Sequence, residues 1–209
     1  MTTHKLGMPP RRVTYDESSR LVCVGCIEGG ATYNGDKSNR GDINMGNCVK
    51  FFDATSFEEI DCFHLGPYEM IMSMISTKLK VTGEVVKSSE EKEDQDSHQP
   101  FLIIGTAYGM PGENEPSRGR IIVLMCTSGN DKSALSRKVQ RVAEVQVKGG
   151  VFSICSFYDG SILATINSKT RMCKLVGDAG LIDLKIIDAG HHGHIISLFV
   201  RSMSDGYCW

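Results

Sequence analysis

The sequence lacks a surplus of charge of either sign and any long apolar run. Its 23 Lys and Arg residues nearly balance 25 Asp and Glu residues, for a formal net charge of -2. A nucleic-acid-binding domain usually carries a basic patch, so direct nucleic-acid binding is not predicted. The opening residues, MTTHKLGMPPRR, contain no apolar run typical of a secretion signal, and no later stretch could span a bilayer. We therefore expect a soluble intracellular protein without a membrane partner.

Motifs of catalysis are also missing. No P-loop, Rossmann glycine pattern or Gly-x-Ser-x-Gly elbow occurs. Glu113 and Glu115 could be imagined as an acid and base pair, but both are expected in a solvent-facing loop with no neighbouring groups that would adapt a carboxyl for catalysis. The HHGH stretch of His191, His192 and His194 has no acid or cysteine at a ligand spacing and is predicted as a polar turn. The protein is predicted not to be an enzyme, with no catalytic residue, metal or cofactor.

A second Cys-x-x-Cys pair is absent as well. The eight cysteines are expected to stay reduced in an intracellular protein. Cys23 and Cys26 form the one such spacing, and a structural zinc site would need a matching pair. Because both lie in an apolar strand pattern, we predict that they are small buried core residues.

The sequence does contain short apolar runs that recur at regular intervals along the chain. Residues 101–104 and 120–124 are rich in β-branched side chains and predict two buried strands. The stretch between them has too many Gly and Pro residues for a helix, and long ordered loops often carry function. That loop displays Glu113 and Glu115.

Similar runs, separated by turn residues, recur along the whole chain and predict about thirteen strands and no amphipathic helix. The predicted strands are 12–15, 21–27, 49–52, 58–64, 68–76, 101–104, 120–124, 139–148, 151–157, 162–166, 171–176, 182–187 and 195–201. With about four strands per blade, they predict an all-β fold, a partial β-propeller of about three blades spanning residues 1–209. The polar stretches 29–47, 84–99 and 127–138 are predicted to be disordered loops.

Taken together and in order, several of these runs resemble the sequence motifs of one protein family. The runs are FLIIGTA at 101–107, PGENEPSRGRIIV at 111–123, VKGGVFS at 147–153, LATINS at 163–168, PRR at 10–12 and HIISLF at 194–199. They resemble the DNA damage-binding protein 1 family, the large adaptor subunit of cullin-4 ubiquitin ligases. The resemblance covers nearly the whole chain and is weakest across 29–47 and 80–99.

The resemblance implies a function as well as a fold. The family's propellers are seven-bladed, and this chain matches the early blades of the third, so it is expected to be a fragment, an isoform or a truncated gene model. The implied role is a substrate-receptor adaptor of a cullin-4 RING E3 ligase, linked to DNA damage recognition and nucleotide excision repair, in the nucleus and also the cytoplasm. The implied partners are WD-repeat receptors, cullin-4 through parts absent here, and damaged DNA through a partner subunit.

The resemblance also implies a partner-binding site in the cleft between propellers. The matching residues are Arg11, Arg12, Ala107, Glu113, Glu115, Gly150, Phe152, Ile196, Leu198 and Phe199. Apolar anchors ringed by charges suit the face of a partner helix. Phe152 replaces the family's usual tyrosine and lacks its hydroxyl. Two alternatives stay open: Ile196 and Leu198 as ordinary strand core, and an RNA-processing scaffold such as the cleavage and polyadenylation specificity factor large subunit or splicing factor 3b subunit 3.

Overall fold

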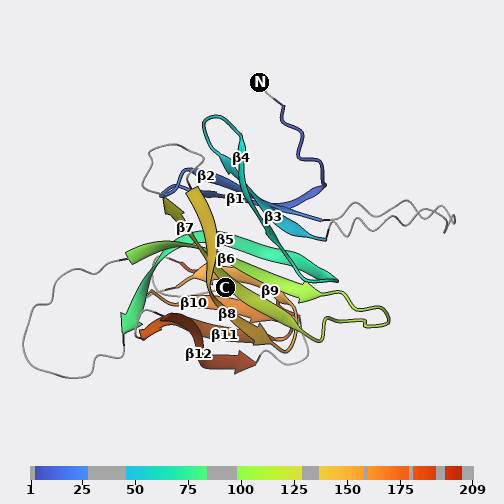
Figure 1. Cartoon of the computed structure of the whole chain (residues 1–209). Coiled ribbons are helices and arrows are strands. Elements are labelled where there is room, and N and C mark those ends of the chain that lie inside the picture. The colour runs from blue at the N-terminus through green and yellow to red at the C-terminus, as the bar shows by residue number, and fades with distance from the viewer. Residues whose placement is uncertain are drawn as a thin grey trace, which may run out of the picture.

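The computed structural model describes residues 3–27, 46–83, 98–128, 137–157, 160–178, 181–191 and 196–203 (Figure 1). These residues form twelve strands and, within the described ranges, no α-helix. None of the described residues therefore belongs to a helix that could cross a membrane. Most of each predicted disordered loop lies outside the described residues.

The strands form three four-stranded antiparallel units, each a meander of consecutive strands. We call these units blades 1, 2 and 3. Blade 1 contains β1 (Pro10–Asp16), β2 (Leu21–Cys26), β3 (Cys48–Asp53) and β4 (Glu59–His64). Blade 2 contains β5 (Glu69–Gly83), β6 (His98–Tyr108), β7 (Gly119–Ser128) and β8 (Arg137–Val147). Blade 3 contains β9 (Val151–Ser156), β10 (Ile162–Ile166), β11 (Lys169–Asp178) and β12 (Leu181–His191).

The blades are stacked in chain order, with blade 1 at the top of Figure 1 and blade 3 at the bottom. Their first strands β1, β5 and β9 contact one another in sequence, and so do their last strands β4, β8 and β12. This is the arrangement of propeller blades, with inner and outer strands. A short parallel pairing of 81–83 on β5 with 175–177 on β11 also joins blades 2 and 3 into one sheet. The prediction of an all-β partial propeller is confirmed.

Two apolar layers lie between adjacent blades, and blade 2 contributes side chains to both. On β6, Phe101 and Ile103 pack into the layer against blade 3, whereas Leu102 and Ile104 pack against blade 1. The same alternation holds on β7 from Ile121 to Leu124. Because successive strand side chains point to opposite faces, a strand covered on both sides needs a continuous apolar run. Each such buried side chain contributes about 1.5–3 kcal/mol through removal from water.

Cross-strand pairing extends the four strands of blade 2 into polar sequence that was predicted as loop or left unassigned. Strand β5 continues to Gly83 because Lys80 pairs with His98 of β6. Likewise Thr127 pairs with Lys138, which places 127–128 and 137–138 in β7 and β8. The predicted boundaries were wrong there because backbone pairing, unlike the apolar pattern, does not depend on side-chain type.

The predicted thirteenth strand, 195–201, is also corrected. Residues 196–200 are not part of a strand, and Ile195 lies outside the described residues. The Ser197 amide donates to the Asn167 carbonyl at 2.9 Å, and the Val200 amide donates to Ser153 Oγ at 3.2 Å. The backbone amides of this segment thus donate hydrogen bonds to a turn carbonyl and to a side chain, instead of to a neighbouring strand.

One buried hydroxyl on β10 leads to a stability prediction. Thr165 is 1% exposed and its Oγ1 has no hydrogen-bond partner in the structure. An unsatisfied buried hydroxyl is destabilising, so Thr165→Val should raise the free energy of unfolding by about 1 kcal/mol, measured by urea denaturation. The matched control is Thr106→Val: Thr106 is equally buried, but its hydroxyl donates to Glu69 Oε1 at 2.6 Å, so this change should destabilise. An equal fall in the free energy of unfolding in both variants would contradict the prediction.

Candidate interaction surface

Three hydrogen bonds place the inner strands and the segment 196–203 side by side. Arg12 Nε on β1 donates to the Met72 carbonyl of β5 at 2.7 Å. Ser73 Oγ on β5 donates to the Val151 carbonyl of β9 at 3.3 Å, and Ser153 on β9 holds the Val200 amide. Predicted site residues near the start of the chain, on β1, and near its end, in 196–203, therefore lie on neighbouring segments along the inner strands of the blades.

A β-bulge at Met72 creates the contact with β1. Ile71 pairs with Thr106 and Ser73 pairs with Gly105, which leaves Met72 without a partner on β6. A bulged residue keeps unpaired backbone groups, so its carbonyl is free to accept from Arg12. Arg11 Nη2 lies 3.7 Å from the Met72 sulfur. Both arginines are exposed, so they rest on β5 with their charge in solvent.

The apolar residues of the predicted site are accessible to different degrees. Leu198 and Phe199 are each 67% exposed, while Phe152 and Ile196 are half-buried. Leu198 is therefore not strand core, because a core leucine would be almost fully covered. Two neighbouring exposed apolar side chains, beside a half-covered phenylalanine on β9, form the apolar part of this surface.

Two other predicted residues are buried and cannot contact a partner directly. Ala107 is 0% exposed, and Gly150 is also buried. A Cβ atom at position 150 would lie 3.0 Å from Ala107 Cβ and 3.1 Å from Pro116 Cγ. The absence of a side chain at Gly150 therefore lets the β6–β7 loop pack closely onto the start of blade 3.

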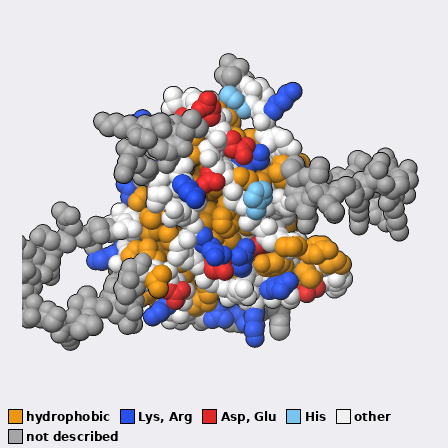
Figure 2. Space-filling model, in the orientation of Figure 1, with side chains coloured by type: hydrophobic (Ala, Val, Ile, Leu, Met, Phe, Trp, Pro, Cys, Tyr) orange, Lys and Arg blue, Asp and Glu red, His pale blue; other side chains and the backbone are white. Residues whose placement is uncertain are grey.

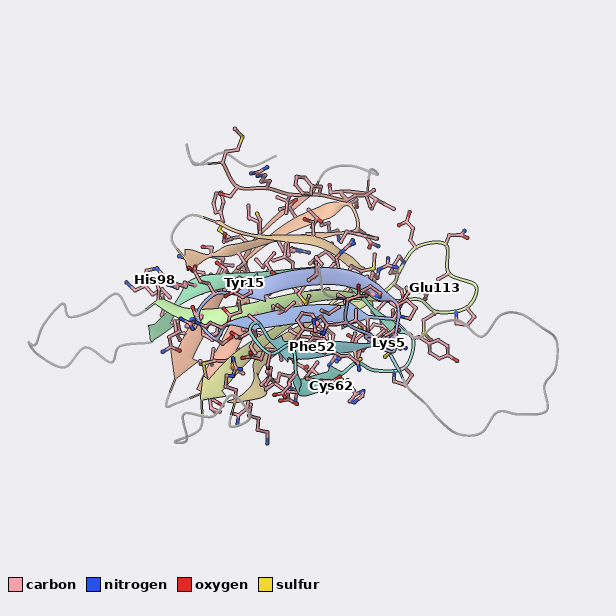
Figure 3. All side chains as sticks on the ribbon, turned by 90° about the horizontal axis from the view of Figure 1, so that it is seen from above. Lys5, Tyr15, Phe52, Cys62, His98 and Glu113 are labelled. Carbon is pink, nitrogen blue, oxygen red and sulfur yellow. The ribbon has the colours of Figure 1, made fainter. Side chains whose placement is uncertain are left out.

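The β6–β7 loop, residues 109–118, is held by its own polar groups. Glu113 accepts hydrogen bonds from the Ser117 amide at 3.2 Å and the Ser117 hydroxyl at 2.8 Å. The Arg118 guanidinium lies 4.5 Å from the centre of the Tyr108 ring. Figure 3 shows Glu113 on the loop, projecting beyond the strands, and Figure 2 shows hydrophobic side chains gathered where this loop leaves the sheet. Glu113 and Glu115 are both exposed, so they stand at the edge of the surface.

Asn167, which is not one of the predicted site residues, links these segments. Its Oδ1 accepts from the Gly150 amide at 2.7 Å, and its Nδ2 donates to the Pro116 carbonyl at 3.0 Å. The backbone N–H of Asn167 donates to the Gly150 carbonyl at 3.1 Å, and its backbone carbonyl accepts a hydrogen bond from the Ser197 amide. Asn167 has a φ of 49°, a left-handed conformation that asparagine tolerates better than most residues. An Asn–Ser turn between two strand patterns is the sequence signal that could have identified it.

A buried ion pair spans blade 2 beneath the loop. Glu69 is fully buried and binds Arg120 through both oxygens, at 2.8 Å to Nε and 2.6 Å to Nη2. Thr106 and the Gly66 amide donate to the same carboxylate, and Arg120 also binds Glu144 at 2.9 Å. Burial by itself would raise the pKa of Glu69, but the hydrogen bonds from Arg120, Thr106 and Gly66 hold it below its ordinary value. The network joins all four strands of the blade.

The Cys-x-x-Cys pair is structural, as predicted. Cys23 and Cys26 are 1% and 0% exposed and belong to different apolar clusters, because residues three apart on a strand face opposite ways. Burial raises the pKa of Cys23 to about 12, so its thiol is protonated at neutral pH. Over the described ranges, no group of three or more His, Cys, Asp or Glu side chains is placed to hold a metal ion. The side chains of the HHGH stretch lie outside what the structure describes.

Comparisons with known proteins agree with the fold. The family model of the CPSF A subunit region matches residues 46–201. DNA damage-binding protein 1 of Solanum lycopersicum is 32% identical over 202 residues, which are 96% of this chain and 16% of that protein. DNA damage-binding protein 1b of Arabidopsis thaliana is 29% identical over 204 residues, 97% of this chain and 16% of that protein.

The chain thus spans about one sixth of the length of these curated relatives, 16% in each case. The resemblance seen in the sequence motifs is confirmed by matches that extend over almost the whole chain. The names of both relatives refer to the binding of DNA damage. The chain belongs to the family of the CPSF A subunit region and is a relative of DNA damage-binding protein 1.

Proposed function

We propose that this chain serves as part of a substrate-receptor adaptor of a cullin-4 RING E3 ubiquitin ligase, linked to DNA damage recognition and nucleotide excision repair. A propeller scaffold supports this role, because its strand edges and loops form a rigid platform for partners. The similarity to proteins named for DNA damage binding supports the link to damage recognition.

The observation that carries the proposal is the surface on the inner strands. It combines exposed Leu198 and Phe199, half-buried Phe152, and flanking charges from Arg11 and Glu113. Apolar anchors at the centre with charges at the rim are the usual anatomy of a protein-binding site. The kind of partner that fits is an amphipathic helix, which places apolar side chains along one face.

The remaining parts of the proposal concern partners and location. WD-repeat substrate receptors are the proposed ligands of this surface. Cullin-4 is proposed to bind parts of the adaptor that lie outside the stretch described here. Contact with damaged DNA is proposed to occur through a partner subunit, in agreement with the net charge of -2. The proposed location is the nucleus, and also the cytoplasm.

The test is to shorten the apolar anchors and compare binding with stability. Phe152→Ala and Leu198→Ala should each weaken receptor binding by about 1–3 kcal/mol, measured by calorimetry or biosensor with a WD-repeat receptor. Since Leu198 is 67% exposed, its removal should leave thermal melting nearly unchanged.

Leu181→Ala is the matched control, because Leu181 is 78% exposed but lies on the outer strand β12. The control should bind receptor normally. Unchanged affinity in the Leu198 variant, or equal losses in the Leu198 and Leu181 variants, would show that this surface is not the receptor site.

The description of the matching family, CPSF A subunit region, favours a second candidate, a propeller scaffold in RNA processing. A pull-down with the full chain separates the two. Recovery of WD-repeat receptors and ubiquitin-ligase subunits supports the first candidate. Recovery of cleavage, polyadenylation or splicing subunits instead supports the second.

A further inference from the structure

A cavity of about 170 Å³ opens between the end of blade 2 and the strands of blade 3. It lies beside the β8–β9 and β10–β11 turns and shares no residue with the surface on the inner strands. The residues that determine its character are Gln146, Lys148, Ile166, Lys169, Arg171 and Ile186. We call it the basic pocket.

The pocket concentrates positive charge. Lys148 and Lys169 are exposed and Arg171 is half-buried, so three cations from two chain segments surround one hollow. No acidic side chain is among its lining residues in the described part of the chain. None of the three cations forms an ion pair with another described residue. Like charges held together without a counter-charge repel each other, and a bound anion would relieve that repulsion.

The lining suits one compact anion better than a long polyanion. Ile166 and Ile186 give the pocket an apolar wall, which strengthens electrostatic attraction to a bound group. Three cations match the charge of a phosphate monoester, about -1.5 to -2, better than the single charge of a carboxylate. A guanidinium can bind two phosphate oxygens at once, and Lys148, Lys169 and the Gln146 amide can donate to the others.

We propose that the basic pocket binds a phosphate monoester carried by a phosphorylated serine or threonine of a protein partner. A nucleic acid backbone is the less favoured source of phosphate, because it requires a basic track and the chain as a whole is slightly acidic. The proposal stands apart from the receptor-binding role, since it uses different residues and a different ligand chemistry.

The experiment titrates the full chain with a fluorescently labelled phosphoserine peptide, its unphosphorylated twin and a short single-stranded DNA. The phosphopeptide should bind, its twin should not, and inorganic phosphate should displace it. Arg171→Gln and Lys169→Gln should each weaken phosphopeptide binding about tenfold, the loss expected for one charge-assisted hydrogen bond. Lys169 is exposed, so its variant gives a result even where Arg171→Gln fails to fold.

Lys78→Gln is the control, because Lys78 is an exposed lysine on β5 outside the pocket and the charge change is the same. It should bind the phosphopeptide like the unmodified chain. Equal weakening in all three variants would reduce the effect to net charge and overturn the proposal. DNA binding that depends on Lys169 while the phosphopeptide does not bind would also overturn it, in favour of a nucleic acid site.

Discussion

Replacing Glu69 with alanine should cost the protein about 3–5 kcal/mol of unfolding free energy. Glu69 is fully buried, and its carboxylate is the counter-charge of Arg120, whose side chain is 14% exposed. Removing one partner of a buried pair leaves the other charge, and its hydrogen-bond donors, without compensation. The bonds lost would include those from Thr106 and the Gly66 amide. The expected result is a large fall in the urea midpoint with little change in its slope.

The control for Glu69 is a more exposed cross-strand ion pair, Lys50–Glu59, at 2.9 Å. The Glu59 side chain is 43% exposed, so solvent screens the pair and Glu59→Ala should cost under about 1 kcal/mol. Comparable losses in Glu59→Ala and Glu69→Ala would mean that burial does not set the strength of the pair at Glu69.

Acid should remove the same contribution. The pKa of Glu69 is lowered in the folded protein, so the folded state favours the ionised carboxylate more than the unfolded chain does. The stabilisation is therefore fully present above the unfolded pKa of about 4.3 and is lost as pH falls through the folded value. The melting temperatures of wild type and Glu69→Gln should converge in acid, whereas a constant difference would exclude ionisation as the cause.

Replacing Asn167 with alanine should destabilise blade 3 by about 2–4 kcal/mol. Two side-chain hydrogen bonds, to the Gly150 amide and the Pro116 carbonyl, contribute about 1 kcal/mol each. A further cost of about 1 kcal/mol arises because alanine tolerates the positive φ less well than asparagine. The same change should increase hydrogen exchange at the Gly150 amide, which loses its acceptor.

Two further variants separate the causes at Asn167. Asn167→Gly loses both hydrogen bonds but keeps easy access to a positive φ, so it should be less destabilised than Asn167→Ala. Asn167→Asp keeps the acceptor for Gly150 and loses the donor to Pro116, so exchange at Gly150 should remain slow. If all three variants melted like the unmodified chain, Asn167 would not hold the loop and the turn together.

The Asn167 variants can also be tested for receptor binding. Asn167 connects the β6–β7 loop, the start of β9 and the segment that carries Leu198, all of which contribute to the proposed surface. A loosened loop should reduce affinity in Asn167→Ala even though Asn167 itself is not one of the apolar anchors. This outcome rests on the proposed receptor-binding role, whereas the stability loss does not.

Local patterns in the sequence were enough for the fold class and for most strands. Alternating faces demand apolar residues at every position of a doubly covered strand, so the runs ending in Ile104 and Leu124 could be identified without knowing their neighbours. Similarly, Cys23 and Cys26 could be assigned to the core, because a single Cys-x-x-Cys pair within an apolar strand lacks the second half of a metal site. Hydrophobic periodicity and residue composition are properties of a short segment. They therefore predict a buried strand whatever neighbours cover it.

The functional geometry depended on contacts between distant segments. Glu69 and Arg120 meet only because β5, β6 and β7 pair in one register, and Arg12 reaches Met72 only because a bulge leaves that carbonyl unpaired. Residues 196–200 show the opposite case: an apolar pattern typical of a strand did not form one, because a strand requires a partner along its length. Pairing register, bulges and turn hydrogen bonds are set by the packing of whole blades, and no short stretch of sequence contains that information.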